Sequence, residues 1–391
     1  MSKWKTVRLG DVCEILNGYA FKSDKYVDSG IRVIRITNVQ KGLIEDNSPA
    51  FYPITEKENI KDYELYDNDL LISLTGNVGR VAQLSKEMLP AALNQRVGCI
   101  RIKDNNLLIS YLFTYLNSDK FESDCVFSAR GIAQKNMSTE WLKKYLIPLP
   151  SIEEQKKMAL ELEKCSKLIS KYQKQLLNFD TLIKSRFIEM FGDPVLNEKG
   201  WEMRTLPELG EFGRGVSKHR PRNAPELLGG KYPLIQTGDV ANANLYITNY
   251  ESTYSEEGLK QSKMWKAGTL CITIAATIAK TAILTFDSCF PDSVVGFTPN
   301  ENTNSLYINY WFTFFQKILE EQAPAVAQKN INLQVLSELK IITPPIELQN
   351  DFASFVQQID KSKFAVQKSL KKAETLYKSL MQEYFGYCIL E

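Results

Sequence analysis

Two stretches of the chain carry a narrow stripe of hydrophobic residues on an otherwise polar background. In residues 151–192 and again in residues 344–391, the apolar positions alternate three and four residues apart. This spacing is typical of a coiled-coil seam, whereas a helix packed on its own domain needs a broader stripe. The pattern therefore predicts two helices of roughly 38 residues, each about 57 Å long, that pair with each other.

The stripe residues are the predicted contacts between these helices. They are Met158, Leu162, Ile169, Tyr172, Leu176, Phe179 and Ile183 in the first stretch, and Phe352, Val356, Ile359, Val366, Leu370 and Tyr377 in the second. Lys363 interrupts the second stripe and Arg186 the first. The alternative is that each helix packs only on the globular domain beside it.

Outside these helices the pattern changes to short runs typical of strands. They include residues 31–39, 69–84 and 97–103 in the first half, and 232–240 and 269–284 in the second. Two helical stretches follow, at residues 107–121 and 305–321. The mixture predicts two α/β (α+β) domains of about 140 residues each.

The two halves are copies of one unit. Residues 131–136 are GIAQKN and residues 325–330 are AVAQKN, and adding 194 takes Gln134 onto Gln328. Because the offset holds over about sixty residues, we infer a tandem duplication. Further upstream, Gly98 is expected to correspond to Gly296. A duplicated chain with paired helices is expected to show pseudo-two-fold symmetry, which would make the helices antiparallel.

The predicted organisation follows from the repeat and the helices. It consists of a domain at 1–150, a central helix at 151–192, a second domain at 193–343 and a C-terminal helix at 344–391.

Composition is that of an ordinary globular protein. Hydrophobic residues make up 44% and charged residues 24%, and no apolar run approaches the roughly 18 residues that a membrane span needs. The N-terminal residues lack the apolar core of a secretion signal. Seven scattered cysteines without a C-x-x-C pair suit a reducing compartment and argue against zinc. We expect a cytoplasmic protein without a membrane segment.

A net charge of +2 gives no overall basic footprint for nucleic acid, so local clusters must supply any such contact. Residues 213–223, GRGVSKHRPRN, contain basic side chains and no acidic one. A flexible basic loop of this kind suits phosphate and base-edge contacts, although a solvated surface loop has the same composition.

Two further segments are candidates. TGNVGR at 75–80 predicts a glycine turn with Arg80 beside it, but it lacks the Lys-Ser/Thr end of a nucleotide-binding loop. In ARGIAQKN at 129–136, the amides of Gln134 and Asn136 either contact DNA or cap the helix that begins at NMSTEWL.

The search for catalytic motifs gives no candidate. The sequence has no Asn-Pro-Pro-aromatic methyl-transfer motif, no glycine-rich cofactor loop after a strand and no complete phosphate-binding loop. His219 is its single histidine, whereas a duplicated fold should duplicate its chemistry. We therefore expect a binding protein and not an enzyme.

The repeated signatures are WKTVRLGDV from Trp4, TGNVGRVA, LNQRVGCI and ARGIAQKNMSTEWLKKYLIPLPSIEEQ, with the second copy AVAQKNINLQVLSELKIITPPIELQ. In these signatures, and over essentially its whole length, the chain resembles the specificity subunits of Type I restriction-modification systems. In the second half Ala276 and Ala279 replace Gly76 and Gly79, and PDSVVGF replaces NQRVGCI. This divergence fits two domains that recognise different sequences.

The resemblance implies a DNA sequence-recognition subunit with two target-recognition domains, each reading one half of an asymmetric bipartite site in double-stranded DNA. The helices would set the spacer and dock two modification subunits that carry S-adenosylmethionine. Restriction (motor-nuclease) subunits using ATP and Mg²⁺ would join them, and no cofactor would bind this chain. The candidate DNA contacts are Arg80, Arg96, Arg130, Gln134, Asn136, Arg214, Lys218, His219, Arg220, Arg222, Lys280, Gln328 and Asn330.

A second hypothesis is a duplicated coiled-coil adaptor that binds only proteins. The variable middles favour DNA recognition, because an adaptor has no need for two unlike domains on like helices.

Overall fold

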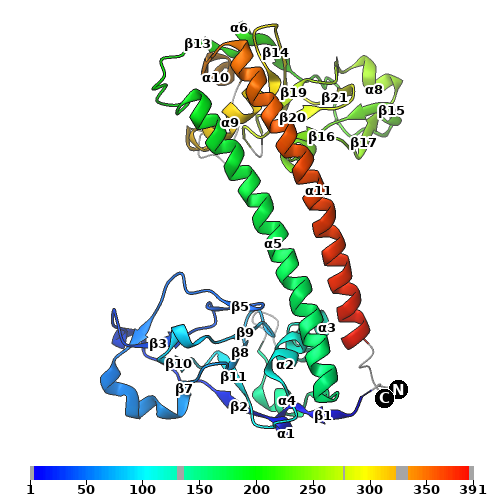
Figure 1. Ribbon diagram of the computed structural model, residues 1–391. Helices are drawn as coiled ribbons and strands as arrows, with labels where there is room; N and C mark the ends of the chain where they lie inside the picture. The colour runs from blue at the N-terminus through cyan, green and yellow to red at the C-terminus, as the bar shows by residue number, and fades with distance from the viewer. Residues whose placement is uncertain (1–3, 130–135, 276–277, 323–332, 387–391) are drawn as a thin grey trace. The chain divides into compact units, whose positions relative to one another are not determined.

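The computed structural model describes residues 4–129, 136–275, 278–322 and 333–386, apart from the side chains of 317–322. The chain forms two compact units. Unit 1 is Met1–Gln173 with Lys368–Glu391, and unit 2 is Lys174–Gln367. Each unit therefore contains one globular half of the chain and part of both long helices (Figure 1).

Unit 1 contains two four-stranded sheets. The first has the order β2 (Cys13–Asn17), β11 (Val97–Ile102), β8 (Leu70–Ser73), β9 (Val81–Gln83), with antiparallel neighbours throughout. The second has the order β6 (Phe51–Tyr52), β3 (Ile31–Ile34), β10 (Ala91–Leu93), β7 (Glu64–Leu65). Two short pairs complete the unit, β1 (Thr6–Arg8) with β12 (Leu146–Pro148) and β4 (Val39–Gln40) with β5 (Leu43–Ile44).

Strand β8 shows why the sequence has a continuous apolar run there. Leu70 and Ile72 belong to one buried cluster and Leu71 to another. A strand with both faces covered needs apolar residues at successive positions, because neighbouring side chains point to opposite faces.

The predicted single helix at 107–121 is two helices in the structure. Helix α2 (Ile109–Leu116) ends before Ser118, and α3 (Asp119–Ser128) begins after it. The Oγ atom of Ser118 accepts a hydrogen bond from Phe121 N at 3.2 Å. The serine side chain caps a new helix and so interrupts the old one. The remaining short α-helices described in this half are α1 (Leu9–Val12) and α4 (Thr139–Lys144), and its 3-10 helices are η1 (Ser23–Lys25), η2 (Ile54–Tyr63) and η3 (Lys86–Met88).

Unit 2 repeats this plan. One sheet has the order β14 (Gly210–Arg214), β22 (Val294–Pro299), β19 (Leu270–Thr273), β20 (Thr281–Leu284), β16 (Tyr246–Ile247), and the other has the order β17 (Ser252–Tyr254), β15 (Leu228–Leu234), β21 (Ser288–Cys289), β18 (Met264–Trp265). The pair β13 (Met203–Thr205) and β23 (Lys340–Ile342) corresponds to β1 and β12. Its helices are α6 (Leu206–Leu209), α7 (Thr237–Asn242), α8 (Glu256–Lys260), α9 (Ser305–Gln322) and α10 (Leu333–Glu338).

Strand register corrects one sequence correspondence. Ile100 lies opposite Leu70, and Phe297 lies opposite Leu270, so these two positions are equivalent. Gly98 therefore corresponds to Val295, and the prediction that it corresponds to Gly296 is wrong by one residue. Matching glycines misled the sequence alignment because the strand partners, and not residue identity, set the register.

The predicted strand pair within 269–284 is confirmed as β19 and β20, and the predicted helix at 305–321 as α9. The expected strand at 232–240 is only partly present. Strand β15 ends at Leu234, and α7 begins at Thr237, where Gln236 N–H donates to the Asp239 carboxylate at 2.7 Å. That local cap favours a helix over a longer strand.

The two long helices are α5 (Ile152–Phe191) and α11 (Ile346–Phe385), each of 40 residues. Ser151 begins α5 with a reciprocal cap, because Ser151 N donates to Glu154 Oε2 at 3.0 Å and Glu154 N donates to Ser151 Oγ at 3.4 Å. Gly192, with φ +78°, ends it in the left-handed conformation that glycine tolerates.

A buried glutamine fixes the start of each long helix to its domain. Gln155 Nε2 donates to the carbonyls of Pro150 and Asn106 at 2.9 and 2.8 Å, and its Oε1 accepts from Leu108 N at 2.8 Å. Gln349 repeats the pattern with Pro344 and Asn302 at 2.8 and 3.3 Å and with Asn304 N at 3.0 Å. Both side chains are fully buried. This explains why the glutamine is kept in SIEEQ and PIELQ.

Within unit 2 the two helix segments run in opposite directions. Asp180 of α5 forms an ion pair with Lys363, and Arg186 lies 5.8 Å from the ring centre of Phe355. Farther along α5, Phe187 contacts Phe352 at 5.4 Å between ring centres. The partners on α11 therefore descend in number as those on α5 ascend.

The predicted stripe is turned away from solvent. Met158, Leu162, Ile183, Phe352 and Val356 are buried, and the other stripe residues are half-buried. In unit 1 the end of α11 meets the start of α5, since Tyr384 donates a hydrogen bond to Glu161.

Candidate nucleic-acid interface

The turn between β8 and β9 is held by Ser73. Its Oγ donates to the Asn77 carbonyl at 2.5 Å and accepts from Arg80 N at 3.0 Å, and its carbonyl accepts from Gly79 N at 3.0 Å. Gly79 has φ +85°, and a Cβ there would lie 2.7 Å from Cys125 Cβ. Glycine is therefore required at this position both for its conformation and for its size.

Backbone hydrogen bonds gather three predicted residues around this turn. Leu74 N donates to the Arg96 carbonyl at 3.0 Å, and Met137 N donates to the Leu74 carbonyl at 2.9 Å. Asn136 forms a β-bridge with Thr75. The structure thus brings Arg80, Arg96 and Asn136 together, although they are distant in sequence. Asn136 does not cap α4, because Ser138 does so by accepting from Trp141 N at 3.1 Å.

Beside the turn lies a hollow of about 320 Å³. Its polar lining consists of Thr37, Gln40, Ser73, Thr75, Asn77, Arg80 and Arg96. Arg80 Nη1 donates to Gln40 Oε1, and within the described ranges neither arginine has a carboxylate partner. The Thr75 hydroxyl is also buried without a hydrogen-bond partner in that part of the chain. Arginine side chains without a carboxylate partner, next to a polar atom without a hydrogen bond, are suited to bind a phosphate or the edge of a base.

Unit 2 forms the same turn with other residues. Thr273 N donates to the Lys280 carbonyl at 2.9 Å, its carbonyl accepts from Ala279 N at 2.9 Å, and its Oγ1 accepts from Lys280 N at 3.1 Å. Ala279 adopts φ +55° without being glycine. Lys280 therefore stands in the place of Arg80. Ile274 N donates to the Ser293 carbonyl at 3.1 Å, so Ser293 stands in the place of Arg96.

The basic loop of unit 2 follows β14 and is held in place by its backbone. Gln261 Oε1 accepts from Lys218 N at 2.6 Å and from His219 N at 3.0 Å, and Ser262 Oγ donates to the Val216 carbonyl at 2.7 Å. These hydrogen bonds hold the loop backbone at Val216, Lys218 and His219. The sequence could not show this, because its partners lie more than forty residues further along the chain.

Two of the loop's arginines share one acid that the sequence analysis missed. Arg222 Nη2 lies 2.5 Å from Asp292 Oδ1, and Arg220 Nη2 lies 3.6 Å from Asp292 Oδ2. Arg220 Nη1 also donates to the carbonyls of Ser217 and His219 at 2.6 and 2.8 Å. The only sequence signal for Asp292 is its place in PDSVVGF, the segment in which the two halves diverge.

The remaining cations of this loop are open to solvent. Arg214 and Lys218 are exposed and have no ion pair in the described part of unit 2. His219 is also exposed, with Nε2 at 3.8 Å from Glu226 Oε1. Four further predicted contacts lie outside the described residues, namely Arg130, Gln134, Gln328 and Asn330.

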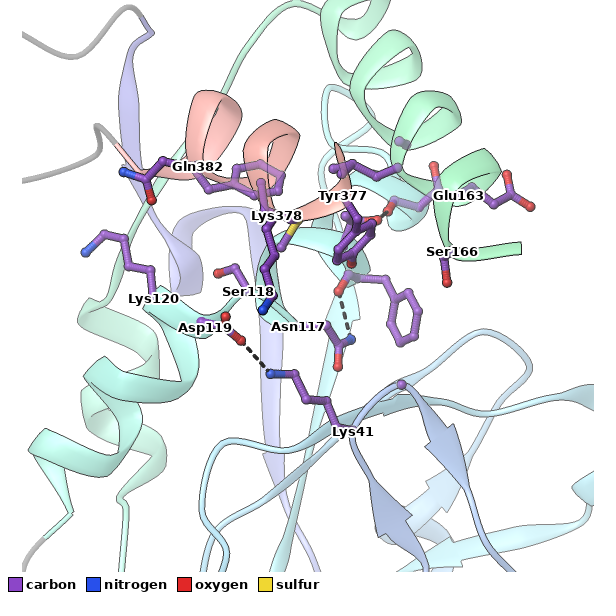
Figure 2. A pocket seen from close by; sticks show the side chains of 18 of the residues that line it. Lys41, Asn117, Ser118, Asp119, Lys120, Glu163, Ser166, Tyr377, Lys378 and Gln382 are labelled. Atoms are coloured by element: carbon purple, nitrogen blue, oxygen red, sulfur yellow. Dashed lines mark hydrogen bonds and ion pairs between the residues drawn. The ribbon is translucent and has the colours of Figure 1, made fainter. Parts of the chain in front are cut away.

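A larger hollow of about 960 Å³ lies in unit 1 among α2, the start of α5 and the end of α11 (Figure 2). Thr114, Met381 and Phe113 contribute to its walls. Lys41 and Asp119 also line it and form an ion pair, with 2.9 Å between Nζ and Oδ1. Of the predicted residues only the helix contacts Leu162 and Tyr377 line it. It is therefore separate from the cationic turn.

Burial makes four of the cysteine thiols poor nucleophiles. It raises the pKa of Cys13 to about 12 and also raises the pKa of Cys99, Cys125 and Cys271. Since the reactive form is the thiolate, these residues serve packing.

Across the described ranges, no group of three His, Cys, Asp or Glu side chains is arranged to hold a metal ion. No described helix is long and apolar enough to cross a membrane.

Comparison with known proteins identifies one family in both halves of the chain. The family described as Type I restriction modification DNA specificity domain matches residues 1–178 and again 198–375. The EcoBI specificity subunit of Escherichia coli is 22% identical over 418 residues, covering 98% of this chain and 85% of that protein. The MjaVIII specificity subunit of Methanocaldococcus jannaschii is 30% identical over 176 residues, covering 44% of this chain and 41% of that protein.

A solved structure shares the fold. The S subunit of the Type I restriction-modification system of M. genitalium superposes with a TM-score of 0.62 at 15% identity, covering 97% of this chain and 95% of that chain. The family match covers both halves of the sequence, in agreement with the duplicated turn and sheets. The chain therefore belongs to the Type I restriction modification DNA specificity domain family, as its sequence resemblance predicted.

Proposed function

We propose that the chain recognises DNA sequence for a Type I restriction-modification complex, and that each globular half reads one half of an asymmetric, bipartite site in double-stranded DNA. The observation that carries this proposal is the repeated turn. Ser73–Arg80 and Thr273–Lys280 share their backbone hydrogen bonds but have different cations around them. A common framework with unlike side chains suits two unlike half-sites.

The proposed contacts differ between the halves. Unit 1 would use Arg80, Arg96 and Asn136, whereas unit 2 would use Arg214, Lys218, His219, Arg220, Arg222 and Lys280. Arg130, Gln134, Gln328 and Asn330, which lie in or next to the two AQKN segments, are proposed as further contacts. Arginine suits this role because its planar fork matches both phosphates and guanine edges.

The long helices are proposed to form an antiparallel coiled coil that sets the spacer between half-sites. Support comes from the stripe, which is buried or half-buried throughout. The ion pair of Asp180 with Lys363 and the ring contact of Phe187 with Phe352 also support it, because they require opposite helix directions. The same helices leave Leu177, Phe364 and Leu376 exposed by 66%, 70% and 52%. Exposed apolar side chains of this size suit protein partners, here two modification subunits.

The chain is proposed to be a non-catalytic subunit in the cytoplasm. S-adenosylmethionine would bind the modification subunits, which would methylate adenine, and ATP and Mg²⁺ would bind the restriction subunits. The sequence supports this assignment by offering no motif for any of these cofactors. The adaptor hypothesis is less well supported, since it gives no role to the unpaired arginines at the turn of unit 1.

The test is to assemble the chain with its modification subunits and to sequence the methylated adenines in genomic DNA. We expect one bipartite motif with a fixed spacer, and binding that weakens with salt as phosphate contacts require. Exchanging residues 1–150 for the same region of another family member should change one half-site only. Methylation without a sequence motif, or a change in both half-sites, would contradict the proposal.

A further inference from the structure

Asp292 sits at the centre of an ordered chain of contacts in unit 2. The carbonyls of Ser217 and His219 hold Arg220 Nη1, Arg220 Nη2 reaches Asp292, and Asp292 holds Arg222. Gln261 fixes the loop backbone beneath them. Arg220 thus contacts both its own loop and the Asp292 carboxylate, whereas Arg222 contacts only Asp292 in the described residues.

We propose that Arg222 recognises a guanine in the half-site read by unit 2, and that Asp292 is the positioning residue that orients its guanidinium. This inference rests on the proposed function and adds a base type and a residue pair to it. It concerns one half-site, because the position of Asp292 is occupied by Gln95 in unit 1.

The chemistry of arginine supports this assignment. A guanidinium has five N–H donors in a rigid fork, and Arg222 shows one contact in the described residues, from Nη2 to Asp292. The remaining donors can therefore meet the O6 and N7 acceptors of guanine, the commonest specific arginine contact in the major groove. Fixing the side chain before DNA arrives also lowers the entropy lost on binding.

The corresponding site in unit 1 is built differently. By strand register, Asp292 corresponds to Gln95 and Ser293 to Arg96. Gln95 is exposed and uncharged, so it cannot hold an arginine as a carboxylate does. Arg96 therefore has no carboxylate partner in the described residues, whereas Arg222 is paired with Asp292.

An alternative role for Asp292 is simple neutralisation of the loop, and the two roles predict opposite effects. If the carboxylate only cancels charge, D292N should strengthen DNA binding at every sequence. If it orients Arg222, D292N should weaken binding to the cognate site while non-cognate binding stays equal or increases. The sign of the change at the cognate site separates them.

The experiment uses the whole complex of this chain with its modification subunits. The variants are D292N, R222K, which keeps the charge but loses the planar fork, and E251Q as a matched control. E251Q removes one exposed carboxylate of unit 2 that has no ion pair in the described residues. Affinity and methylation are measured on the cognate site and on sites substituted singly at each guanine of both half-sites.

We expect D292N and R222K to lose about tenfold in cognate affinity and to relax preference at the same guanine. The other half-site and the thermal midpoint of the complex should not change, and E251Q should behave like the parent. Tighter binding by D292N with unchanged base preference would overturn the positioning role, and full preference in R222K would overturn base recognition by Arg222. A parent complex without any sequence motif would instead refute the proposed function, and this inference with it.

Discussion

Unit 1 and unit 2 share the hydrogen bonds that hold their backbone framework, but they differ in the side chains around it. Gln155 and Gln349 make equivalent hydrogen bonds, and Ser73 and Thr273 close equivalent turns. Around those turns, however, unit 1 leaves Arg80 and Arg96 without an acid, whereas unit 2 ties Arg220 and Arg222 to Asp292. The residues that bond the backbone are thus alike in the two units, whereas the side chains of the proposed contact surface differ.

The same contrast holds where the long helices meet their domains. In unit 1 the hollow of about 960 Å³ is lined by Thr114 and Met381. Unit 2 has Tyr310 and Phe187 at the corresponding positions, whose rings lie 5.5 and 5.4 Å from that of Phe352. Unit 2 thus fills with aromatic rings a region that unit 1 leaves open.

The largest effect is expected from lengthening α5, which tests whether the two units act as separate readers. Inserting four residues after Leu176 adds about 6 Å of helix and shifts the seam. We expect methylation at the original sites to disappear and to reappear at sites with unchanged halves and a spacer longer by one or two base pairs. Sequencing the methylated sites measures this outcome.

A seven-residue insertion at the same point is the matched variant, because it preserves the seam and should add about three base pairs. An active variant that kept the original spacer would show that the helices do not set the distance. Loss of all methylation by both variants would mean that docking of the modification subunits tolerates no change.

The shared framework predicts equal losses in the two units when its glutamines are removed. Q155L and Q349L should each lower the free energy of unfolding by about 3 kcal/mol, because buried carbonyl and N–H groups lose their partners. Denaturant unfolding followed by circular dichroism measures the change. Q173L and Q357L, at exposed positions of the same helices, should change it by less than about 0.5 kcal/mol.

Exchanging glycine and alanine should change stability unequally in the turns of unit 1 and unit 2. G79A is expected to cost about 2 kcal/mol or more, because its Cβ would meet Cys125 in a left-handed conformation. A279G should change stability by less than about 1 kcal/mol, since relief of the left-handed conformation offsets the lost buried methyl group. Thermal unfolding of both variants measures the difference.

G76A is the internal control for this pair. Gly76 has φ +69° but open space where a Cβ would stand, so its cost should be the conformational part alone, about 1 kcal/mol. Equal losses for G76A and G79A would argue against the contact with Cys125.

The smallest effect concerns the unpaired arginine of unit 1. R96A should weaken binding of the complex to its site by about tenfold and relax only the half-site read by unit 1. R96K separates the roles of the side chain, because a phosphate contact survives the change and a bidentate base contact does not. Binding titrations on sites substituted in each half measure both effects, with R8A as an exposed arginine control in β1. A uniform loss in R96A and full recovery in R96K would assign Arg96 to the phosphates.

The sequence by itself determined the features that depend on short windows of residues. The stripe spacing predicted both long helices, the apolar run at 69–84 predicted β8 and β9 with their glycine turn, and the constant offset revealed the duplication. Such features follow from local periodicity, since the face that each residue occupies is set within one or two turns or strands.

Tertiary structure alone decided which side chains meet. Asp292 lies 70 positions after Arg222, and the backbone of Leu74 bonds to both Arg96 and Met137, the residue after Asn136, although no sequence pattern marks these contacts. The register of β22 likewise shows that Gly98 corresponds to Val295 and not to Gly296. These outcomes depend on where distant strands return and in which register they pair, and that is settled by the packing of the whole sheet.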